Sequence, residues 1–517
     1  MRDWILGWGR GRAREQLGQL VNLAGIAIAT GWLLARLVPH LRVITQPGPV
    51  EYNEPAIWQC TFLLDHGRNP YTAQELPGAA YCFDPLYNYL MLALKPVIGI
   101  DYTAHRFVNL LLLLGTLGLL VRTMRRAGAG LGIALLSAVA FYWMCLYNIM
   151  ITARPDLLGL FFFLLGILVP WENGYSRRST ILGLVCALVA FHCKLYFILA
   201  GCATLLGHFL VRDKREACWL GVGFFAAAGL SFAVWCHFFP YYYIETVVVQ
   251  RGGAVLNSSD EVSAEHTLML FDRGWPFLLL MVCGVGAWLW RRQVARRAGR
   301  VTGTPDDRRF LALGAVFLIF LVLVYFYMGR NAGAYFTYHL HLLFPLMVVL
   351  AAYAIRGPWM RIGYGLLLAG FVMFRLTVPA VPDADGPYRR LEKLIYTCKG
   401  EVLGIASVTD IFERQGRRVL HNGNTMFIGF AFADDGINRD PMISVLGDHY
   451  NATIAEVERK VAAHEYAMVL TEFDAPYFCT EELLKMHYDK VEQIDYYTYF
   501  GHSPVRVWRP KPPAGER

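Results

Sequence analysis

The sequence predicts an α-helical polytopic membrane protein of about eleven transmembrane helices, followed by a small C-terminal extracytoplasmic α/β domain. Of the 517 residues, 56% are hydrophobic and only 17% are charged, which leaves too little polar surface for a soluble protein. The apolar residues gather in runs near the length that crosses a bilayer, roughly 17–25 residues. Beyond residue 380 the pattern changes to short strand-like and helix-like runs, which predicts a soluble domain.

The spans follow from the apolar runs in chain order. The expected ranges are 20–41, 105–122, 128–147, 156–171, 180–195, 196–211, 218–239, 273–290, 310–328, 338–355 and 362–380. The first run follows a basic leader and lacks a small-residue cleavage site, so we interpret it as a retained anchor. The fifth and sixth spans must turn around a single charged residue, Lys194.

The orientation follows from the basic residues. Lys and Arg are concentrated in the leader and in every second connection, with seven Arg between residues 291 and 309. The positive-inside rule therefore predicts a cytoplasmic N-terminus, and an odd number of spans places the C-terminus outside. The net charge of +8 is explained by this orientation, and we expect membrane lipids but no nucleic acid as partners.

Three long segments are expected on the outer side. The first, 42–104, contains a semi-apolar stretch from Asp84 that predicts an interfacial helix ending near Lys95 and Pro96. The second, 240–272, contains Arg251-Gly-Gly and an acidic, Ser-rich stretch that predicts a mobile loop. The third, 381–517, is the α/β domain, and 1–380 is the membrane domain.

The expected outer segments contain four of the 11 cysteines, Cys60, Cys82, Cys398 and Cys479. Four cysteines allow three pairings, of which one bond within each segment is the simplest. Free thiols are an equally good interpretation, because the spacing is not diagnostic.

Ionisable residues from distant parts of the chain gather at the outer face. The candidates are Glu51, Glu54, Asp65, Asp84, Arg154, Asp156, Lys194, Arg251, Arg330, His339 and His341. A carboxylate there could act as a general base toward a hydroxyl or amine, and the cations could hold a phosphate. The alternative interpretation is ordinary solvated charge, which we favour for Glu75, Asp101 and Glu245. The chain contains no Walker loop, HExxH or CxxC motif.

Several short motifs resemble one superfamily. They are Tyr52-Asn-Glu-Pro, Leu64-Asp-His-Gly-Arg-Asn-Pro-Tyr71, Asp84-Pro-Leu-Tyr-Asn-Tyr-Leu90, Ala153-Arg-Pro-Asp156 and Tyr338-His-Leu-His-Leu-Leu-Phe-Pro. Together they resemble the GT-C glycosyltransferases, in particular the bacterial relatives of protein O-mannosyltransferases, including the aminoarabinose transferase and the RgtA/B/C/D-type enzymes. The resemblance covers roughly residues 50–360.

The resemblance implies an inverting sugar transfer from a polyprenyl-phosphate donor to a lipid, glycan or protein acceptor at an extracytoplasmic active site of the plasma (inner) membrane. Glu51 or Glu54 would be the base, with Asp156 assisting. Lys194, Arg330, His339 and Arg154 would bind the donor phosphate, and Asp65, Asp84 and Arg251 would lie toward the acceptor or in the loop. Some relatives bind a divalent cation here, such as Mg²⁺ or Mn²⁺, and others do not.

A secondary transporter or flippase of a lipid-linked substrate is the main alternative. It predicts inverted repeats and broken spans with charge near the midplane, whereas these charges gather at one face.

Overall fold

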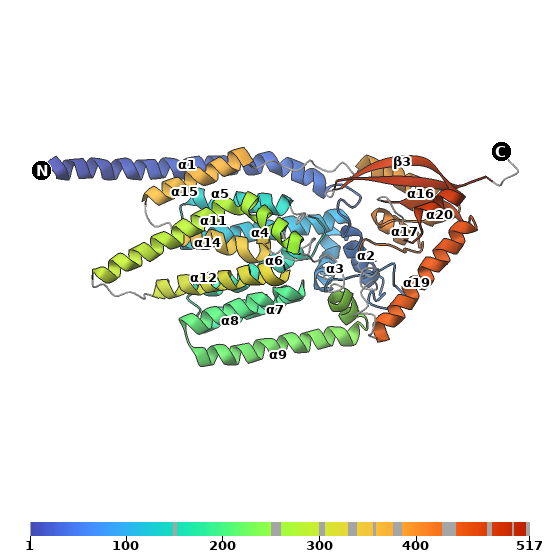
Figure 1. Ribbon diagram of the computed structural model, residues 1–517, viewed down its shortest axis with the longest axis horizontal. Coiled ribbons are helices and arrows are strands. Elements are labelled where there is room, and N and C mark those ends of the chain that lie inside the picture. Colours follow the sequence, from blue (N-terminus) through green and yellow to red (C-terminus); the bar gives the residue numbers. More distant parts are fainter. Residues whose placement is uncertain are drawn as a thin grey trace.

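The computed structural model describes residues 2–147, 152–249, 260–298, 305–328, 339–354, 358–375, 385–425, 441–472, 478–498 and 501–512. A bundle of long helices occupies one end of the long axis, and a four-stranded sheet with its helices occupies the other (Figure 1). The N-terminal end of α1 (Arg2–Ile44) lies at the end of the bundle away from the sheet.

Every expected span overlaps a helix of this bundle. Its helices are α1, α4 (Tyr102–Arg126), α5 (Leu131–Tyr147), α6 (Asp156–Glu172), α7 (Arg177–Phe191), α8 (Leu199–Val211), α9 (Lys214–Phe238), α11 (Asp260–Arg297), α12 (Pro305–Leu323), α14 (Phe344–Ala354) and α15 (Pro358–Arg375). Short turns of 3₁₀ or π helix adjoin three of them: η1 (Leu195–Ile198), η3 (Val324–Met328) and η4 (His339–Leu343).

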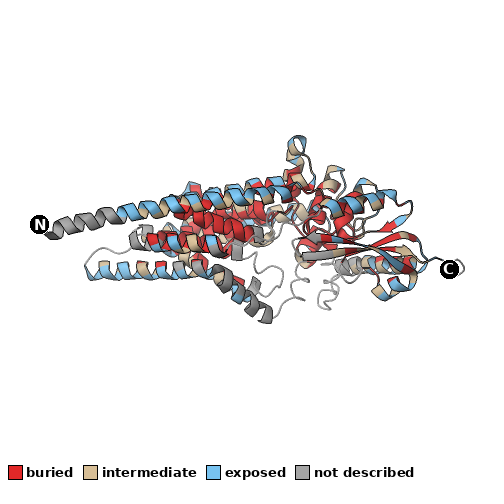
Figure 2. Cartoon of the chain, turned by 90° about the horizontal axis from the view of Figure 1, so that it is seen from above, coloured by how far each residue is buried: buried red, intermediate tan, exposed pale blue. Residues whose placement is uncertain are grey.

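Five of the described helices are long and apolar enough to cross a membrane, namely α1, α4, α9, α11 and α12. The others are shorter, so the number that crosses stays a prediction. The helices of the bundle are exposed along their outer side (Figure 2). That side carries large apolar side chains, such as Trp219 and Leu230 of α9, which are 67% and 69% exposed. Such an apolar exterior is costly in water and favourable in lipid.

Local sequence explains where several helices begin and how closely they pack. Asp101 and Asp213 accept hydrogen bonds from the first turns of α4 and α9, which satisfies otherwise unpaired N–H groups. Gly166 and Gly183 bring α6 and α7 together, since a Cβ on Gly183 would lie 2.7 Å from the Gly166 carbonyl oxygen. Small residues at such crossings are typical of membrane helices.

The connections sort to the two ends of the bundle as the alternation predicts. At the end away from the sheet, Arg122 and Arg126 both pair with Glu172, at 2.6 and 2.7 Å. At the sheet end, the expected outer connections touch one another, as in the contact between the rings of Tyr71 and Phe239. The side of the membrane on which each end lies stays a prediction.

The first outer segment forms two helices, α2 (Glu54–Asp65) and α3 (Leu86–Ile98). A helix is therefore present where the interfacial one is expected, and it continues past Lys95 and Pro96 with 83% of Val97 exposed. That it lies on the membrane surface stays a prediction.

The second outer segment differs from the expected loop. It contains η2 (Ile244–Val249), and α11 already begins at Asp260, because residues 260–272 are rich in good helix formers and continue into the span. The expected mobile stretch, 250–259, lies outside the described residues.

The C-terminal segment contains a mixed sheet in the order β1-β2-β4-β3. Its strands are β1 (Glu401–Leu403), β2 (Tyr466–Thr471), β3 (Tyr488–Thr498) and β4 (Gly501–Pro510). β1 pairs parallel to β2, β2 pairs antiparallel to β4, and β3 and β4 form a hairpin. The accompanying helices are α16 (Asp385–Thr397), η5 (Ala406–Val408), α17 (Thr409–Arg414), α19 (Pro441–Ala462) and α20 (Glu481–His487). The expected small α/β unit is thus present, although β3 and α16 were not anticipated.

Candidate functional site

Glu51 lies in the short connection between α1 and α2, and it is 1% exposed. Asn53 donates a hydrogen bond to each of the Glu51 carboxylate oxygens. The Asn53 backbone N–H donates to Oε2 at 2.9 Å, and Asn53 Nδ2 donates to Oε1 at 2.8 Å. Burial raises the pKa of the Glu51 carboxyl from 4.5 to about 7, although the nearby Arg154 opposes the shift. Glu51 is therefore oriented and has a pKa near neutral pH.

Arg154 connects Glu51 to a second carboxylate. Its Nη1 lies 3.5 Å from Glu51 Oε1, and its Nε donates to Asp156 Oδ2 at 3.0 Å. Asp156 is the first residue of α6, directly after Pro155, and is 1% exposed. A proline before the helix and a carboxylate in its first turn are both typical of a helix N-terminus.

Lys194 completes the row from the other side of Asp156. The turn between α7 and η1 brings its Nζ to 2.7 Å from Asp156 Oδ1. We call these four residues, Glu51, Arg154, Asp156 and Lys194, the charge row. All four were predicted as site residues, and they come from three parts of the chain that are distant in sequence.

Aromatic and imidazole groups surround the Lys194 end of the charge row. The Lys194 ammonium lies 5.3 Å from the centre of the Phe83 ring. His341, in η4 just before α14, is fully buried and its Nδ1 lies 2.6 Å from the Tyr196 hydroxyl. His341 Nε2 has no hydrogen-bond partner among the described residues. Phe83 and Tyr196 were not predicted as site residues, because nothing in their local sequence distinguishes them from other interfacial aromatics.

Glu54 has a different environment from Glu51. Its two oxygens accept four hydrogen bonds, two from the Arg106 guanidinium at 2.8 and 2.6 Å and one each from the backbone of Val50 and Ala153, both at 2.7 Å. Glu54 and Arg106 are completely buried. A carboxylate with every position filled cannot readily take a substrate proton, so this pair positions the backbone on either side of the charge row. Sequence analysis missed Arg106, which lies inside an expected span.

Asp84 and Asp65 lie outside the charge row. Asp84 accepts hydrogen bonds from the Tyr242 hydroxyl at 2.5 Å and the Leu86 backbone at 3.1 Å, and His192 Nδ1 lies 2.9 Å from it. It therefore ties the first outer segment to the segment after α9. Asp65 pairs with the half-exposed Lys95 at 2.6 Å.

The side chains of three other predicted site residues lie outside the described part of the structure. Arg251 and Arg330 lie outside the described residues, and the side chain of His339 is also not described.

The acids that we interpreted as solvated charge do not all fit that interpretation. Glu245 is 1% exposed and accepts a hydrogen bond from the Tyr81 backbone at 2.7 Å. Asp101 caps α4, and Glu75 pairs with Arg68 at 2.6 Å. The interpretation is wrong for Glu245, which the short η2 helix turns inward onto the first outer segment.

The C-terminal segment packs directly on the residues that flank Glu51. The Tyr496 hydroxyl donates to the Pro49 carbonyl at 2.6 Å, and Asn422 donates to Gln59 at 2.8 Å. Gly423 has φ +90°, and a Cβ there would lie 1.9 Å from the Tyr52 carbonyl oxygen. Only glycine fits so close an approach with this backbone conformation.

The charge row does not offer a metal site in this arrangement. The Arg154 guanidinium already lies between the carboxylates of Glu51 and Asp156, where a divalent cation would need both. Across the described part of the chain, no three His, Cys, Asp or Glu residues cluster as metal ligands.

The four outer cysteines form no disulfide in the described structure, and all four are buried. The structure therefore agrees with free thiols, one of the two interpretations that the sequence left open.

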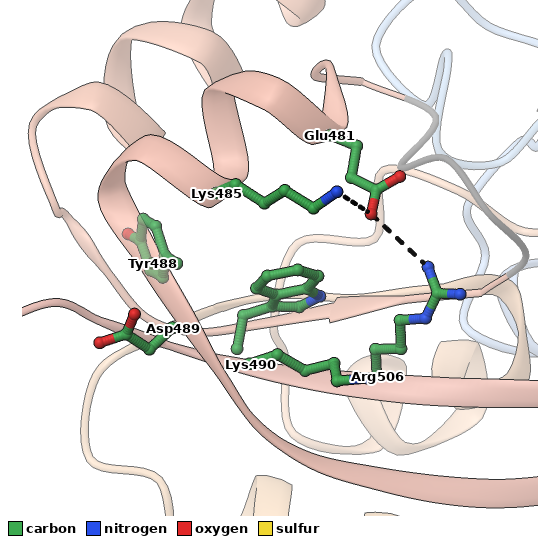
Figure 3. A pocket seen from close by; sticks show the side chains of 7 residues that line it. Glu481, Lys485, Tyr488, Asp489, Lys490 and Arg506 are labelled. Atoms are coloured by element: carbon green, nitrogen blue, oxygen red, sulfur yellow. Dashed lines mark ion pairs between the residues drawn. The ribbon is translucent and has the colours of Figure 1, made fainter.

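A surface pocket of about 440 Å³ also lies on the sheet, between α20 and the β3–β4 hairpin (Figure 3). Glu481 there pairs with Lys485 at 2.9 Å and lies 3.9 Å from Arg506. Glu481 is only partly buried there and the pocket lies on the surface of the sheet, formed by α20, β3 and β4 and by none of the charge-row residues, so we do not include it in the candidate site.

No protein-family model and no curated protein sequence matches the chain. Among solved structures, the chain is similar to ArnT from Cupriavidus metallidurans bound to undecaprenyl phosphate, with 15% identity and a TM-score of 0.46 over 92% of this chain and 97% of that one. The apo form of the same protein gives 13% identity and a TM-score of 0.40, over 93% and 98% of the two chains.

A third similar structure is the Archaeoglobus fulgidus oligosaccharyltransferase tethered to an acceptor peptide containing the NVT sequon. It gives 12% identity and a TM-score of 0.49, over 96% of this chain and 74% of that one. ArnT, an aminoarabinose transferase, and the oligosaccharyltransferase both belong to the GT-C superfamily, which the motifs of the first outer segment resemble.

Proposed function

We propose that this protein is a membrane glycosyltransferase that moves a sugar from a polyprenyl-phosphate donor to a lipid, glycan or protein acceptor at the outer face of the membrane. The charge row carries the proposal. It places a carboxylate with a near-neutral pKa at one end and a lysine at the other, with Arg154 and Asp156 between them. Such a transfer needs a base at the nucleophile and cations at the leaving group.

Glu51 is the proposed base. Both of its oxygens are held by Asn53, so its orientation is fixed, whereas the oxygens of Glu54 are filled by four donors. A pKa near 7 lets the carboxylate be ionised before the reaction and still accept a proton as the acceptor attacks.

Lys194 and Arg154 are the proposed ligands of the donor phosphate. Both contact Asp156, which holds the two cations at fixed positions beside each other. Lysine provides a compact charge and arginine a planar pair of donors, which together suit a phosphate ester. Asp156 is thus a positioning residue in this proposal.

The reaction balances without a further reactant. A bond forms between the acceptor oxygen or nitrogen and the anomeric carbon, as the bond between that carbon and the phosphate oxygen breaks. The acceptor proton passes to Glu51, and the electron pair of the broken bond leaves with polyprenyl phosphate. Direct displacement by the acceptor inverts the anomeric centre.

The test is transfer by the purified full-length chain in proteoliposomes. Labelled undecaprenyl-phosphate sugars are supplied as donors with a total lipid and glycan extract as the acceptor pool, and we expect labelled product and free undecaprenyl phosphate. A protein that moves the donor across the bilayer without forming product is a flippase, and that outcome contradicts the proposal.

A further inference from the structure

A pocket of about 310 Å³ lies where the C-terminal segment meets α2 and the start of α4. Trp58, Phe62 and His66 line it at intervals of four residues, which places them on one side of α2. The rest of the lining is Asp65, which pairs with Lys95, then Ile100 and Asp101 at the start of α4, and Arg414 at the end of α17. Two parts of the chain more than 300 residues apart thus form one cavity, near the lower end of the usual range for small ligands, about 300–1,000 Å³.

Trp58 and Phe62 of α2 and His66, the residue directly after it, form a row of ring contacts. The Trp58 and Phe62 rings are stacked with centres 5.0 Å apart, and the His66 ring lies 4.1 Å from Phe62. The Arg414 guanidinium lies over Trp58 at 5.6 Å from the ring centre. The result is a rigid, largely apolar wall with a fixed positive charge beside it.

The polar residues of the pocket use only part of their hydrogen-bonding capacity. Asp101 caps α4 with Oδ1, and His66 Nδ1 lies 2.8 Å from the Phe62 carbonyl. Arg414 pairs with Asp410 at 3.4 Å, yet its side chain is 42% exposed. The second oxygen of Asp101 and the second nitrogen of His66 have no protein partner among the described residues, so they remain available to a ligand.

The pocket also lies close to the charge row. Trp58 belongs, with Tyr102, to the same small buried cluster as Ala153, the residue before Arg154. Asp101 marks the point where α4 leaves the outer segment and enters the bundle, so the pocket lies at the end of the bundle that meets the C-terminal segment.

We propose that this pocket binds a sugar unit of the acceptor, an inference that rests on the proposed function. A sugar presents an apolar face of C–H groups and a rim of hydroxyls. Phe62 and His66, the two rings of the wall that are not buried, match the apolar face. Asp101 and His66 Nε2 accept from hydroxyls, because His66 Nδ1 directs its hydrogen to the Phe62 carbonyl, and Arg414 donates to them. The C-terminal segment thereby contributes a binding residue, Arg414, and does more than cover the site.

Saturation-transfer NMR on the full-length chain in nanodiscs tests the inference, with the methyl glycosides of glucose, galactose and mannose as probes. We expect transfer to at least one glycoside. The variant His66→Ala/Asp101→Asn/Arg414→Gln should weaken that binding by about tenfold or more, since several hydrogen bonds are lost. The double variant His66→Ala/Asp101→Asn, which keeps Arg414 beside Asp410 and a capping side chain on α4, should show an intermediate loss.

Arg418→Gln and Asp489→Asn are the matched controls, because both residues belong to the C-terminal segment, are exposed and lie outside the pocket. Equal glycoside binding in the triple variant and the wild type overturns the inference, and so does a wild type that binds none of the three probes. Undecaprenyl phosphate binding is measured on the same samples. If the wild type binds undecaprenyl phosphate but no glycoside, the result contradicts the pocket alone. If the wild type does not bind undecaprenyl phosphate, the result contradicts the proposed function.

Discussion

The Lys194 ammonium lies 2.7 Å from the Asp156 carboxylate, and both side chains are largely buried. Asp156 also accepts from Arg154 at 3.0 Å, so a single carboxylate holds two cations. Buried charges of this kind are costly unless each is paired. In the proposed function, these two cations bind the phosphate of the donor.

Replacing Lys194 should weaken donor binding and leave folding largely intact. In Lys194→Met the apolar stem remains and Arg154 still pairs with Asp156. We expect undecaprenyl phosphate to bind roughly 10- to 100-fold more weakly, the range for loss of a charged hydrogen bond. Titration in nanodiscs measures the effect. Lys95→Met, which removes an exposed lysine of the same outer face, is the control, and an equal loss in both variants would argue against a phosphate at Lys194.

Replacing Glu54 should lower the stability of the protein more than replacing Glu51 does. Glu54→Gln leaves the buried Arg106 without its charge partner, and we expect a loss of about 3–5 kcal/mol of stability. Glu51→Gln keeps the shape of the side chain and one acceptor oxygen for Asn53, and it leaves no buried charge without its only partner because Arg154 still pairs with Asp156. We therefore expect a smaller loss of stability than in Glu54→Gln. Thermal unfolding in detergent compares the two. A Glu54→Gln protein as stable as the wild type would show that the Glu54–Arg106 pair does not support the fold as described.

Transfer should depend on the ionisation of Glu51. Because its folded pKa is about 7, the base is mostly protonated below that pH, and the rate should fall about tenfold for each pH unit below it. A pH profile of transfer under subsaturating acceptor measures this. A rate that is flat from pH 5 to 8 would contradict a role for Glu51 as base.

The raised pKa of Glu51 also predicts how the stability of the fold depends on pH. The folded protein binds a proton at Glu51 between the ordinary pKa of 4.5 and about 7, where the unfolded chain has already lost it. The contribution of Glu51 to stability therefore falls as pH rises through that window. Glu51→Gln should lessen this fall, and unfolding midpoints of both proteins at several pH values provide the comparison.

Docking of the C-terminal segment should depend on Gly423. In Gly423→Ala the new Cβ would meet the Tyr52 carbonyl, so the contact beside Glu51 should open and the exchange of backbone amides near residue 52 should rise. Gly416→Ala is a matched control, because its φ of +62° is also left-handed but open space surrounds it. Hydrogen exchange of both variants measures the difference, and equal protection at residue 52 would contradict the role of this contact.

Much of this arrangement could be predicted from sequence because the features that identify a membrane helix lie within its own segment of the chain. A run of apolar residues and a set of flanking Arg residues are each visible without knowing what they contact, and Asp156 after Arg154-Pro could hardly lack a partner in lipid. Arg106 could not be found in this way, since its acidic partner is 52 residues away and the helix around it remains apolar. β3 was missed because its first half, which includes Asp489, Lys490 and Glu492, is polar and mostly exposed, so that regular alternation with buried residues begins only at Ile494.

The most direct test of the central claim is transfer by Glu51→Gln compared with Glu465→Gln, an acid-to-amide change at an exposed ion pair of the C-terminal segment. Both variants are first shown to bind undecaprenyl phosphate as the wild type does. We predict that Glu51→Gln lowers the transfer rate by at least about 100-fold, the lower range for loss of a general base, and that Glu465→Gln leaves it unchanged. Wild-type transfer by Glu51→Gln would contradict the claim that Glu51 takes the acceptor proton.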